Sequence, residues 1–529
     1  MELKNIFRVS LVAAAVSLTT ACGGDINITP TVNDNSTTST DNSVGDNSQT
    51  YNGGSAPVEE NPCASYDDVQ GELVGNDCVY DTVFASKNVQ INENVTFRAL
   101  EEDGIHVFDG ALQIGEDCNT TNGCSVPQNG PVMTVQAGAT LAFNSGEAII
   151  RIARGAKVNA IGTFDKPITF TSAKAFDRFN SEGTLPKYAD WGGIIINGNG
   201  VTDQCTDAER AAKTCNAESE GVLSHFGGTN NADSSGTLRY AKIWYAGSGP
   251  RVGGEGDDLN SLTLNAVGSG SEFSYLHIHQ GFDDGVEIFG GAADLYNIAV
   301  TDTQDDSFDF DAGWQGNAAF LFVKHGTVTL DDGTVVSMGN NGFETDGRKG
   351  ETSAEAPETN PTISNVTIIT TDENSVRDDD PSQAFKFDDY INSTYRNVLM
   401  VKADTTNGTD CVEFKTDGEK QADMISFEGS TMACVSEFKG DANFSADAAT
   451  ALVGTAKTAW FDNSGANNRL GAASDVLAAN GFATNTASTA LATASTDGAA
   501  NFVGAVSDQD TTTNWYKWVE MAVAAANDD

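Results

Sequence analysis

The 529-residue sequence predicts an all-β fold, a right-handed parallel β-helix (solenoid) with capped ends. Three observations predict it. Five fragments repeat one pattern, a polar turn followed by alternating apolar and charged residues: DGVEIFGG, DSFDFDAG, NGFETDGR, QAFKFDDY and DCVEFKTD. An apolar strand precedes each fragment, which gives a unit of about 20 to 25 residues that is typical of stacked solenoid coils. The composition, with 54 Gly and 11 Pro, suits many tight turns.

The alternation within each fragment follows from strand geometry, because successive side chains of a strand point to opposite faces. We expect an inward column of Val286, Phe308, Phe343, Phe385 and Val412, and a second of Ile288, Phe310, Phe387 and Phe414. The outward columns are Glu287, Asp309, Glu344, Lys386, Glu413 and Glu437, and then Phe289, Asp311, Asp346, Asp388, Lys415 and Lys439. The turn column is Asp284, Asp306, Asn341, Gln383 and Asp410. Its polar side chains are expected to form a ladder of hydrogen bonds.

We expect five parts. These are a signal peptide of the lipoprotein type (1–21), a lipid-anchored disordered tether (22–60), a disulfide-containing N-terminal cap with the first strands (61–130), the parallel β-helix (131–445) and an irregular C-terminal capping region (446–529). The first two rest on the resemblance described in the next paragraph. The end of a solenoid must be covered, because its last coil otherwise exposes an open edge. We expect Trp515 and Trp518 to pack there.

The N-terminus carries targeting signals. Lys4 and Arg8 precede the apolar run VSLVAAAVSL, which is too short to span a bilayer. The following LTTAC resembles a bacterial lipoprotein signal, which implies cleavage before Cys22 and acylation of that cysteine. An ordinary secretory signal is the alternative. The Gly23 that follows favours the outer membrane, on either its periplasmic or its surface-exposed side.

The remaining eight cysteines predict disulfides, since an even number in an exported chain is typical of them. Proximity in the sequence favours the pairs Cys63 with Cys78, Cys118 with Cys124, Cys205 with Cys215, and Cys411 with Cys434.

Charge restricts the partners. The chain has 29 Lys and Arg against 75 Asp and Glu, a formal net charge of −46. Such a chain repels nucleic acid and attracts cations.

Four carboxylates are the best candidate site. Asp309, Asp311, Glu344 and Asp346 are expected to form a square on adjacent coils. Like charges about 4.8 Å apart repel by roughly 3 kcal/mol at an effective dielectric near 20, so a Ca²⁺ ion would offset the repulsion. The alternative is a hydrated surface balanced by Lys386, Lys415 and Lys439. His277 with His279 offers a weaker metal site that lacks a third ligand. Trp191, Trp244, Tyr245 and Trp314 are either sugar-stacking platforms or core residues.

A resemblance adds to this interpretation. Residues Gly155, Gly162, Thr163, Pro167, Phe170, Thr171, Trp191, Gly192 and Gly193 form an order of motifs similar to right-handed parallel β-helix proteins of bacterial surfaces. The chain from Cys63 onward also resembles a family of uncharacterised outer-membrane lipoproteins of Gram-negative bacteria, including leptospiral ones. The resemblance implies the fold, whereas function remains open because β-helices serve many functions.

Three functions remain. The first is a lipid-anchored cell-envelope protein with an extended face for a carbohydrate or an outer-membrane protein partner. The second is a Ca²⁺-assisted polysaccharide lyase or a glycosidase. Resemblance to β-helix lyases would then give Lys386 or Arg348 the role of the base. The third is a structural stalk or adhesin.

Overall fold

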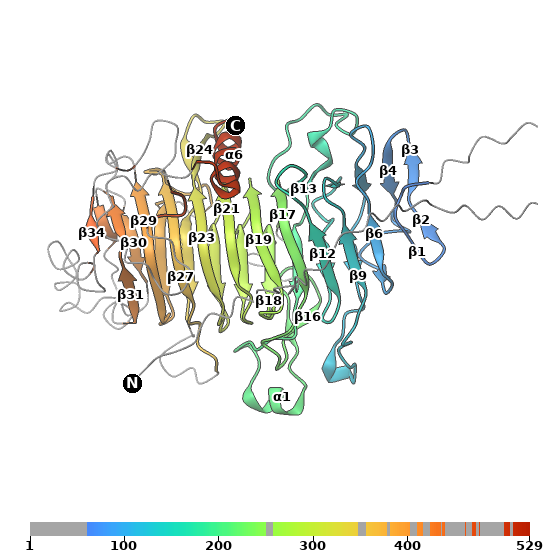
Figure 1. Cartoon of the computed structure of the whole chain (residues 1–529), viewed down its shortest axis with the longest axis horizontal. Coiled ribbons are helices and arrows are strands. Elements are labelled where there is room, and N and C mark those ends of the chain that lie inside the picture. The colour runs from blue at the N-terminus through green and yellow to red at the C-terminus, as the bar shows by residue number, and fades with distance from the viewer. Residues whose placement is uncertain are drawn as a thin grey trace, which may run out of the picture. The chain divides into compact units, whose positions relative to one another are not determined.

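The computed structural model describes residues 61–249, 258–347, 356–377, 381–402, 410–415, 424–434, 436–439, 461, 468–471, 476, 502–507 and 511–528. Within them the chain forms a parallel β-helix, which confirms the predicted fold class (Figure 1). The expected signal peptide (1–21), the lipid-bearing Cys22 and the tether (22–60) lie outside the described residues, as does Arg348. Among the described helices, none combines the length and the hydropathy that crossing a membrane requires.

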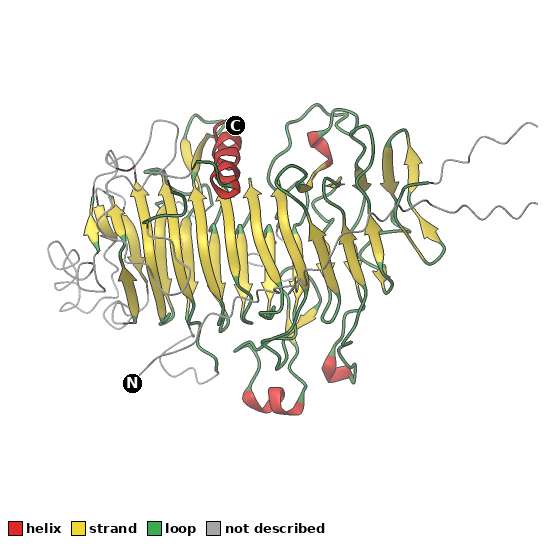
Figure 2. Ribbon diagram, viewed as in Figure 1, coloured by secondary structure: helices red, strands yellow, loops and turns green. Residues whose placement is uncertain are grey.

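Two long sheets build the β-helix (Figure 2). The larger sheet contains β3 (Glu72–Val74), β4 (Asp77–Tyr80), β6 (Val95–Phe97), β7 (His106–Phe108), β9 (Val132–Val135), β10 (Thr140–Phe143), β12 (Lys157–Ile161), β13 (Ile168–Ser172), β17 (Gly236–Trp244), β19 (Glu272–His279), β21 (Leu295–Thr301), β23 (Asn317–Lys324), β27 (Thr362–Thr370), β29 (Ser393–Lys402), β31 (Ile425–Glu428), β32 (Thr431–Ala433) and β34 (Arg469–Leu470). The second contains β5 (Gln90–Ile91), β8 (Leu112–Ile114), β11 (Ile150–Ile152), β14 (Ile194–Asn197), β18 (Leu262–Asn265), β20 (Val286–Phe289), β22 (Phe308–Asp311), β26 (Asn341–Asp346), β28 (Gln383–Asp388), β30 (Asp410–Phe414) and β33 (Ser436–Lys439).

Short elements lie beside these sheets. Antiparallel pairs form between β1 (Ser65–Tyr66) and β2 (Val69–Gln70), β15 (Ala217–Glu218) and β16 (His225–Phe226), and β24 (Gly326–Thr329) and β25 (Val335–Met338). The described helices are α1 (Asp207–Ala212), α6 (Asn514–Asp528) and the short 3-10 turns η1 (Thr120–Asn122) and η2 (Ala173–Ala175).

The coils change form along the chain. Early coils use three separate strands, whereas β17 pairs with β12 through its first half and with β13 through its second half. From β17 onward, one bent strand replaces two. The residue at the bend has a positive φ in each case, from 49° to 61°, at Tyr240, Tyr275, Asn297, Phe320, Asn365 and Asn397. Asn tolerates this left-handed conformation better than the aromatic residues do.

The predicted inward columns form the core. Val286, Phe308, Phe343, Phe385 and Val412 are neighbours on successive strands, and all are fully buried. The ring of Phe343 stacks between those of Phe308 and Phe385, with centroids 5.0 Å and 5.1 Å away. One outward position is corrected. Lys439, and not Glu437, pairs with Glu413, because the last coil enters β33 two residues later than the sequence pattern indicated.

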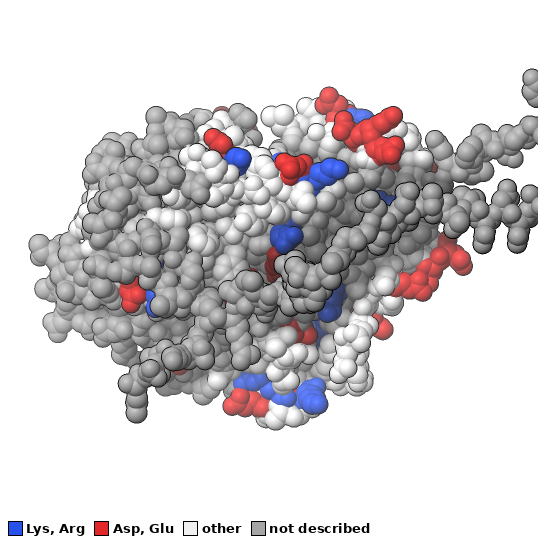
Figure 3. Space-filling view, in the orientation of Figure 1, with Lys and Arg blue, Asp and Glu red and all other residues white. Residues whose placement is uncertain are grey.

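The four expected disulfides are present: Cys63–Cys78, Cys118–Cys124, Cys205–Cys215 and Cys411–Cys434. The third closes a loop that carries α1, whose mixed acidic and basic side chains gather at the bottom of the view in Figure 3.

Trp515 and Trp518 do not pack at the end of the solenoid, contrary to expectation. Their helix, α6, contacts β19, β21 and β23 in the middle of the larger sheet. The indole of Trp518 donates to the carbonyl of Leu276 at 3.1 Å, and both tryptophans join an apolar cluster with Phe322 and Leu399 on the outer surface of the strands. The helix therefore covers an outward apolar stripe that would otherwise face water.

Candidate functional site: a carboxylate ladder on the second sheet

In-register strands bring the acidic residues together. Glu287 on β20 pairs with Asp309 on β22, and Asp309 pairs with Glu344 on β26. Glu344 in turn pairs with Lys386 on β28. Neighbouring strands are about 4.8 Å apart, so like charges in one column cannot avoid each other.

A second set of carboxylates comes from the turns before these strands. Asp284 and Asp306 are buried, at 7% and 2% exposure. The Asp306 amide donates to Oδ1 of Asp284 at 2.9 Å, and the Asn341 amide donates to Oδ1 of Asp306 at 2.6 Å. This is the hydrogen-bond ladder that the turn column predicted. Each side chain bonds to the next coil through its Oδ1 atom, so these aspartates join neighbouring coils.

We define the carboxylate ladder as Asp284, Glu287, Asp306, Asp309, Glu344 and Asp346. Carboxylate oxygens within 4.8 Å of one another form three groups in this region: Asp283 with Asp284 and Asp305; Asp284 with Glu287 and Asp309; and Glu344 with Asp346 and Asp388. The four residues of the predicted square therefore do not lie in a single group. Asp309 belongs to one group, Glu344 and Asp346 belong to another, and Asp311 lies beside the ladder, near enough to act on the pKa of Asp346.

Burial makes these carboxyl groups hard to ionise. It is the first cause that raises the pKa of Asp309 well above its ordinary value, and the nearby Asp284 and Glu344 raise it further. Burial also raises the pKa of Glu287, where the Glu220 carboxyl group adds to the effect. Asp346 shows the same direction, from burial first and then from Glu344. Desolvation and like charge act together on Glu287, Asp309 and Asp346, so these three groups hold protons at pH values where exposed carboxylates do not.

Glu344 differs from its neighbours because a cation pairs with it. Burial acts to raise the pKa of Glu344, but Lys386 and a hydrogen bond with Asp306 lower it below the ordinary value. The ammonium nitrogen of Lys386 lies 2.6 Å from a Glu344 oxygen. Burial alone would lower the pKa of Lys386, yet the adjacent Glu344 and Asp306 carboxyl groups raise it. A lysine held protonated in this way is a poor general base.

A second cation lies at the edge of the ladder. The Arg377 guanidinium contacts Asp258 at 2.6 Å, Asp283 at 3.1 Å and Asp305 at 3.5 Å. It also lies over the Phe282 ring, 4.9 Å from the centroid. Arg377 therefore offsets the negative charge of Asp283 and Asp305. Within the described structure it makes no ion pair with Asp309.

Two ladder oxygens lack partners. Within the described part of the chain, the Oδ1 atoms of Asp309 and Asp346 are buried and accept no hydrogen bond, and the same holds for Oδ1 of Asp258 beside the ladder. Buried acceptors of this kind are uncommon and require an explanation, such as an ion. Carboxylate oxygens are the donors that Ca²⁺ takes, in sets of six to eight, so the residues present fit a hard cation.

The other candidates have structural environments. His277 and His279 are buried and share the Thr301 hydroxyl at 3.0 Å and 2.8 Å. Trp191 and Trp314 are fully buried and belong to the core, so they offer no sugar platform. Trp244 is half-buried and lies under the Lys242 ammonium, 4.6 Å from the ring centroid.

Sequence reasoning did not assign several residues of this region to the site. The doubled aspartates in FDDGVE and QDDSFD, which contain Asp283, Asp284, Asp305 and Asp306, are interpreted from the sequence as turn residues or as a pair similar to that of β-helix glycosidases, and not as metal ligands. Glu220 lies between β15 and β16, and Arg377 lies between β27 and β28. No periodic pattern of the sequence predicts where a side chain in such a connecting segment lies.

Fold and site together define a parallel β-helix protein with a buried, cation-attracting acidic ladder on one sheet. The family model described as "Pectate-lyase like beta helix domain" matches residues 111–486, and the chain belongs to that family. Comparison with curated proteins and with solved structures finds no match.

Proposed function

We propose that this protein is a lipid-anchored polysaccharide-binding β-helix of the cell envelope, with Ca²⁺ held by the carboxylate ladder. The observation that carries the proposal is the convergence of Asp284, Glu287 and Asp309 within 4.8 Å, together with the buried and unpartnered Oδ1 of Asp309. Membership of the pectate-lyase-like family supports a carbohydrate ligand. The LTTAC motif at Cys22 supports the anchor in the outer membrane.

The cation would neutralise the ladder and attract the acidic groups of a polysaccharide. The residues of this chain would supply its oxygen ligands from successive coils: Asp284, Glu287 and Asp309 at one position, and Glu344, Asp346 and Asp388 at another. Two positions separated along the solenoid suit a ligand that is itself a repeating chain. The first position has no compensating Lys or Arg within its own group, so it has the greater need of a cation.

The test is calorimetric titration of Ca²⁺ into the metal-free protein, followed by a glycan array with Ca²⁺ and with a chelator. We expect Ca²⁺ binding that disappears in the Asp309→Asn, Asp346→Asn double variant, and glycan signals that require Ca²⁺. Ca²⁺ binding without any glycan signal would leave a cation-stabilised structural protein, a stalk or adhesin. Absence of both would refute the proposal.

A hydrolytic activity is the second candidate, and one observation favours it over a lyase. The Asp283 carboxyl group is half-buried, and burial is the first cause that raises its pKa, as a general acid requires. The half-buried Asp305 lies in the same group and would be its partner, with Arg377 in contact with both carboxylates. A lyase needs a neutral base, and the raised pKa of Lys386 opposes that role. Reducing-sugar release without an unsaturated product would identify hydrolysis.

A further inference from the structure

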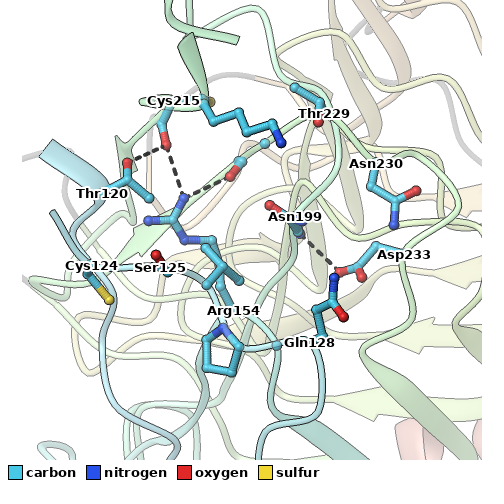
Figure 4. A pocket seen from close by; sticks show the side chains of 16 residues that line it. Thr120, Cys124, Ser125, Gln128, Arg154, Asn199, Cys215, Thr229, Asn230 and Asp233 are labelled. Atoms are coloured by element: carbon cyan, nitrogen blue, oxygen red, sulfur yellow. Dashed lines mark hydrogen bonds between the residues drawn. The ribbon is translucent and has the colours of Figure 1, made fainter. Parts of the chain in front are cut away.

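A second site lies at the turns that follow β8, β11 and β14, on coils that precede those of the carboxylate ladder. Three segments enclose a cavity of about 540 Å³ there, which we call the disulfide pocket (Figure 4). Its walls come from Thr120–Gln128, from the loop that Cys205–Cys215 closes, and from Gly227–Asp233. Cys118–Cys124 fixes the first wall. The size falls within the roughly 300 to 1,000 Å³ of small-molecule sites.

Arg154 anchors this pocket. The side chain is 2% exposed, yet it lines the cavity. One guanidinium nitrogen donates to the carbonyls of Cys215 at 3.0 Å and Gly227 at 2.8 Å, and the other reaches Cys118 and the amide oxygen of Asn216. Arg154 thus joins both disulfide loops. Its Nε is buried and has no hydrogen-bond partner among the described residues.

The charge of the pocket is opposite to that of the chain. Arg154 and Lys213 are the basic residues of the lining, and Asp233 is its acidic residue. One Asp233 oxygen already accepts the amide of Asn199 at 3.2 Å. Behind the wall, a second buried guanidinium, Arg151, also has an unpartnered nitrogen.

The acid that acts on these guanidinium groups is already engaged. Burial lowers the pKa of Arg151 and Arg154, and Asp117 opposes that shift, but its carboxylate also pairs with His225 at 2.6 Å. Buried charge without a full complement of partners is costly, and an anion would remove that cost. The lining also offers hydroxyl and amide groups, including those of Ser125, Thr229 and Asn230, beside the apolar Val126 and Pro127. These polar groups suit a ligand that carries hydroxyls.

From these observations we infer that the disulfide pocket binds a small, hydroxyl-bearing oxyanion, with Arg154 and Lys213 as its cationic partners. Carboxylate and phosphate share this chemistry. Figure 4 shows Arg154 between Thr120 and Cys215 on one side and Asn199, Asn230 and Asp233 on the other, which is the arrangement that such a ligand would span.

The experiment is calorimetric titration of D-glucuronate, inorganic phosphate and D-glucose into the full-length protein. EDTA is present throughout, so the result does not depend on cation binding at the ladder. We expect D-glucuronate or phosphate to bind at least tenfold more tightly than D-glucose, and added salt to weaken the binding. The tighter of the two anions identifies the ligand as a carboxylate or a phosphate.

Two variants with opposite expected effects locate the binding. Lys213→Gln removes an exposed charge that no described residue pairs with, and should weaken anion binding about five- to tenfold. Asp233→Asn removes the acidic residue of the lining and should tighten anion binding severalfold. The matched control is Lys87→Gln, an exposed lysine outside the pocket, which should change nothing.

Three results would overturn the inference. One is that D-glucose binds as tightly as both anions, or that none of the three probes binds. Another is an unchanged affinity in Lys213→Gln. The third is an equal loss in the Lys87→Gln control. Circular dichroism of each variant establishes that it is folded, and Lys213 lies at an exposed helix end where Gln is tolerated.

Discussion

Replacing Asp309 by Asn should stabilise the metal-free protein at neutral pH and abolish much of its response to Ca²⁺. Asp309 lies between Glu287 and Glu344 in register, and its Oδ1 is buried without a partner among the described residues. Each neighbouring charge at about 4.8 Å repels by roughly 3 kcal/mol at an effective dielectric near 20. The raised pKa of Asp309 relieves part of this repulsion through protonation, so we expect a net gain of about 1 to 2 kcal/mol at pH 7.5.

The same pKa shifts predict how the stability of the metal-free protein changes with pH. Folding raises the pKa of Glu287, Asp309 and Asp346, with burial as the first cause. Groups with a raised folded-state pKa stabilise the protein below their unfolded-state pKa, and this stability is lost as pH rises through the folded-state pKa. Metal-free wild type should therefore be more stable near pH 5 than at pH 7.5. Ca²⁺ competes with protons for the same oxygens, so its stabilisation should grow with pH.

Thermal melts with EDTA or with CaCl₂ at the two pH values are the assay. At a hundredfold excess over Kd, Ca²⁺ should contribute about 2.7 kcal/mol to the wild type at pH 7.5. The matched control is Asp331→Asn, which removes an exposed carboxylate in the turn between β24 and β25 and should leave both responses intact. If Asp309→Asn lowers the metal-free melting temperature at pH 7.5, or if the Ca²⁺ shift is equal at both pH values, the reasoning fails.

Three other predictions address the core, the anchor and the helix. Phe343→Ala empties a fully buried position between two stacked rings and should cost about 3 to 5 kcal/mol in denaturant unfolding, whereas a cost under about 1 kcal/mol would contradict the inward assignment. Cys22→Ser should release the protein from membranes in cell fractionation, since no thiol remains for acylation; a mutant that stays bound would argue against the lipoprotein signal. Trp518→Ala should loosen α6 from β19–β23 and expose the C-terminus to limited proteolysis, with the exposed Lys517→Ala as control.

The sequence predicted those parts of the structure that repeat. Phe308, Phe343 and Phe385 could be aligned because each coil offers the same apolar pair, and the structure places them in one buried column. Prediction failed where the repeat stops. The shift from Glu437 to Lys439 follows from an irregular last coil, whose entry into β33 no pattern fixes.

The sequence predicted a cluster of carboxylates on this sheet, but it did not predict all the residues that form the cluster. The strand pattern brought Asp309 beside Glu344, as expected. It could not bring in Arg377, which reaches the ladder from a segment between strands. For α6, the tryptophans indicated burial, but only the outward apolar stripe, with Phe322 and Leu399, decides where that burial occurs. Tertiary contacts of this kind have no local signal in the sequence.

Two adjacent columns of the same coils differ in how their carboxyl groups are compensated, and the difference supports the outward column as the main source of ligands for the proposed cation. In the turn column, Asp284 and Asp306 accept amide hydrogen bonds from the next coil, so their burial is compensated by the backbone. In the outward column, the Oδ1 atoms of Asp309 and Asp346 accept no hydrogen bond within the described structure. A column that served only to complete the coil could carry Thr or Asn at lower cost, as Thr263 does beside Glu287. Acids at these positions cost both desolvation and repulsion, which supports the proposal that a cation binds to Asp309 and Asp346, as Lys386 already does to Glu344.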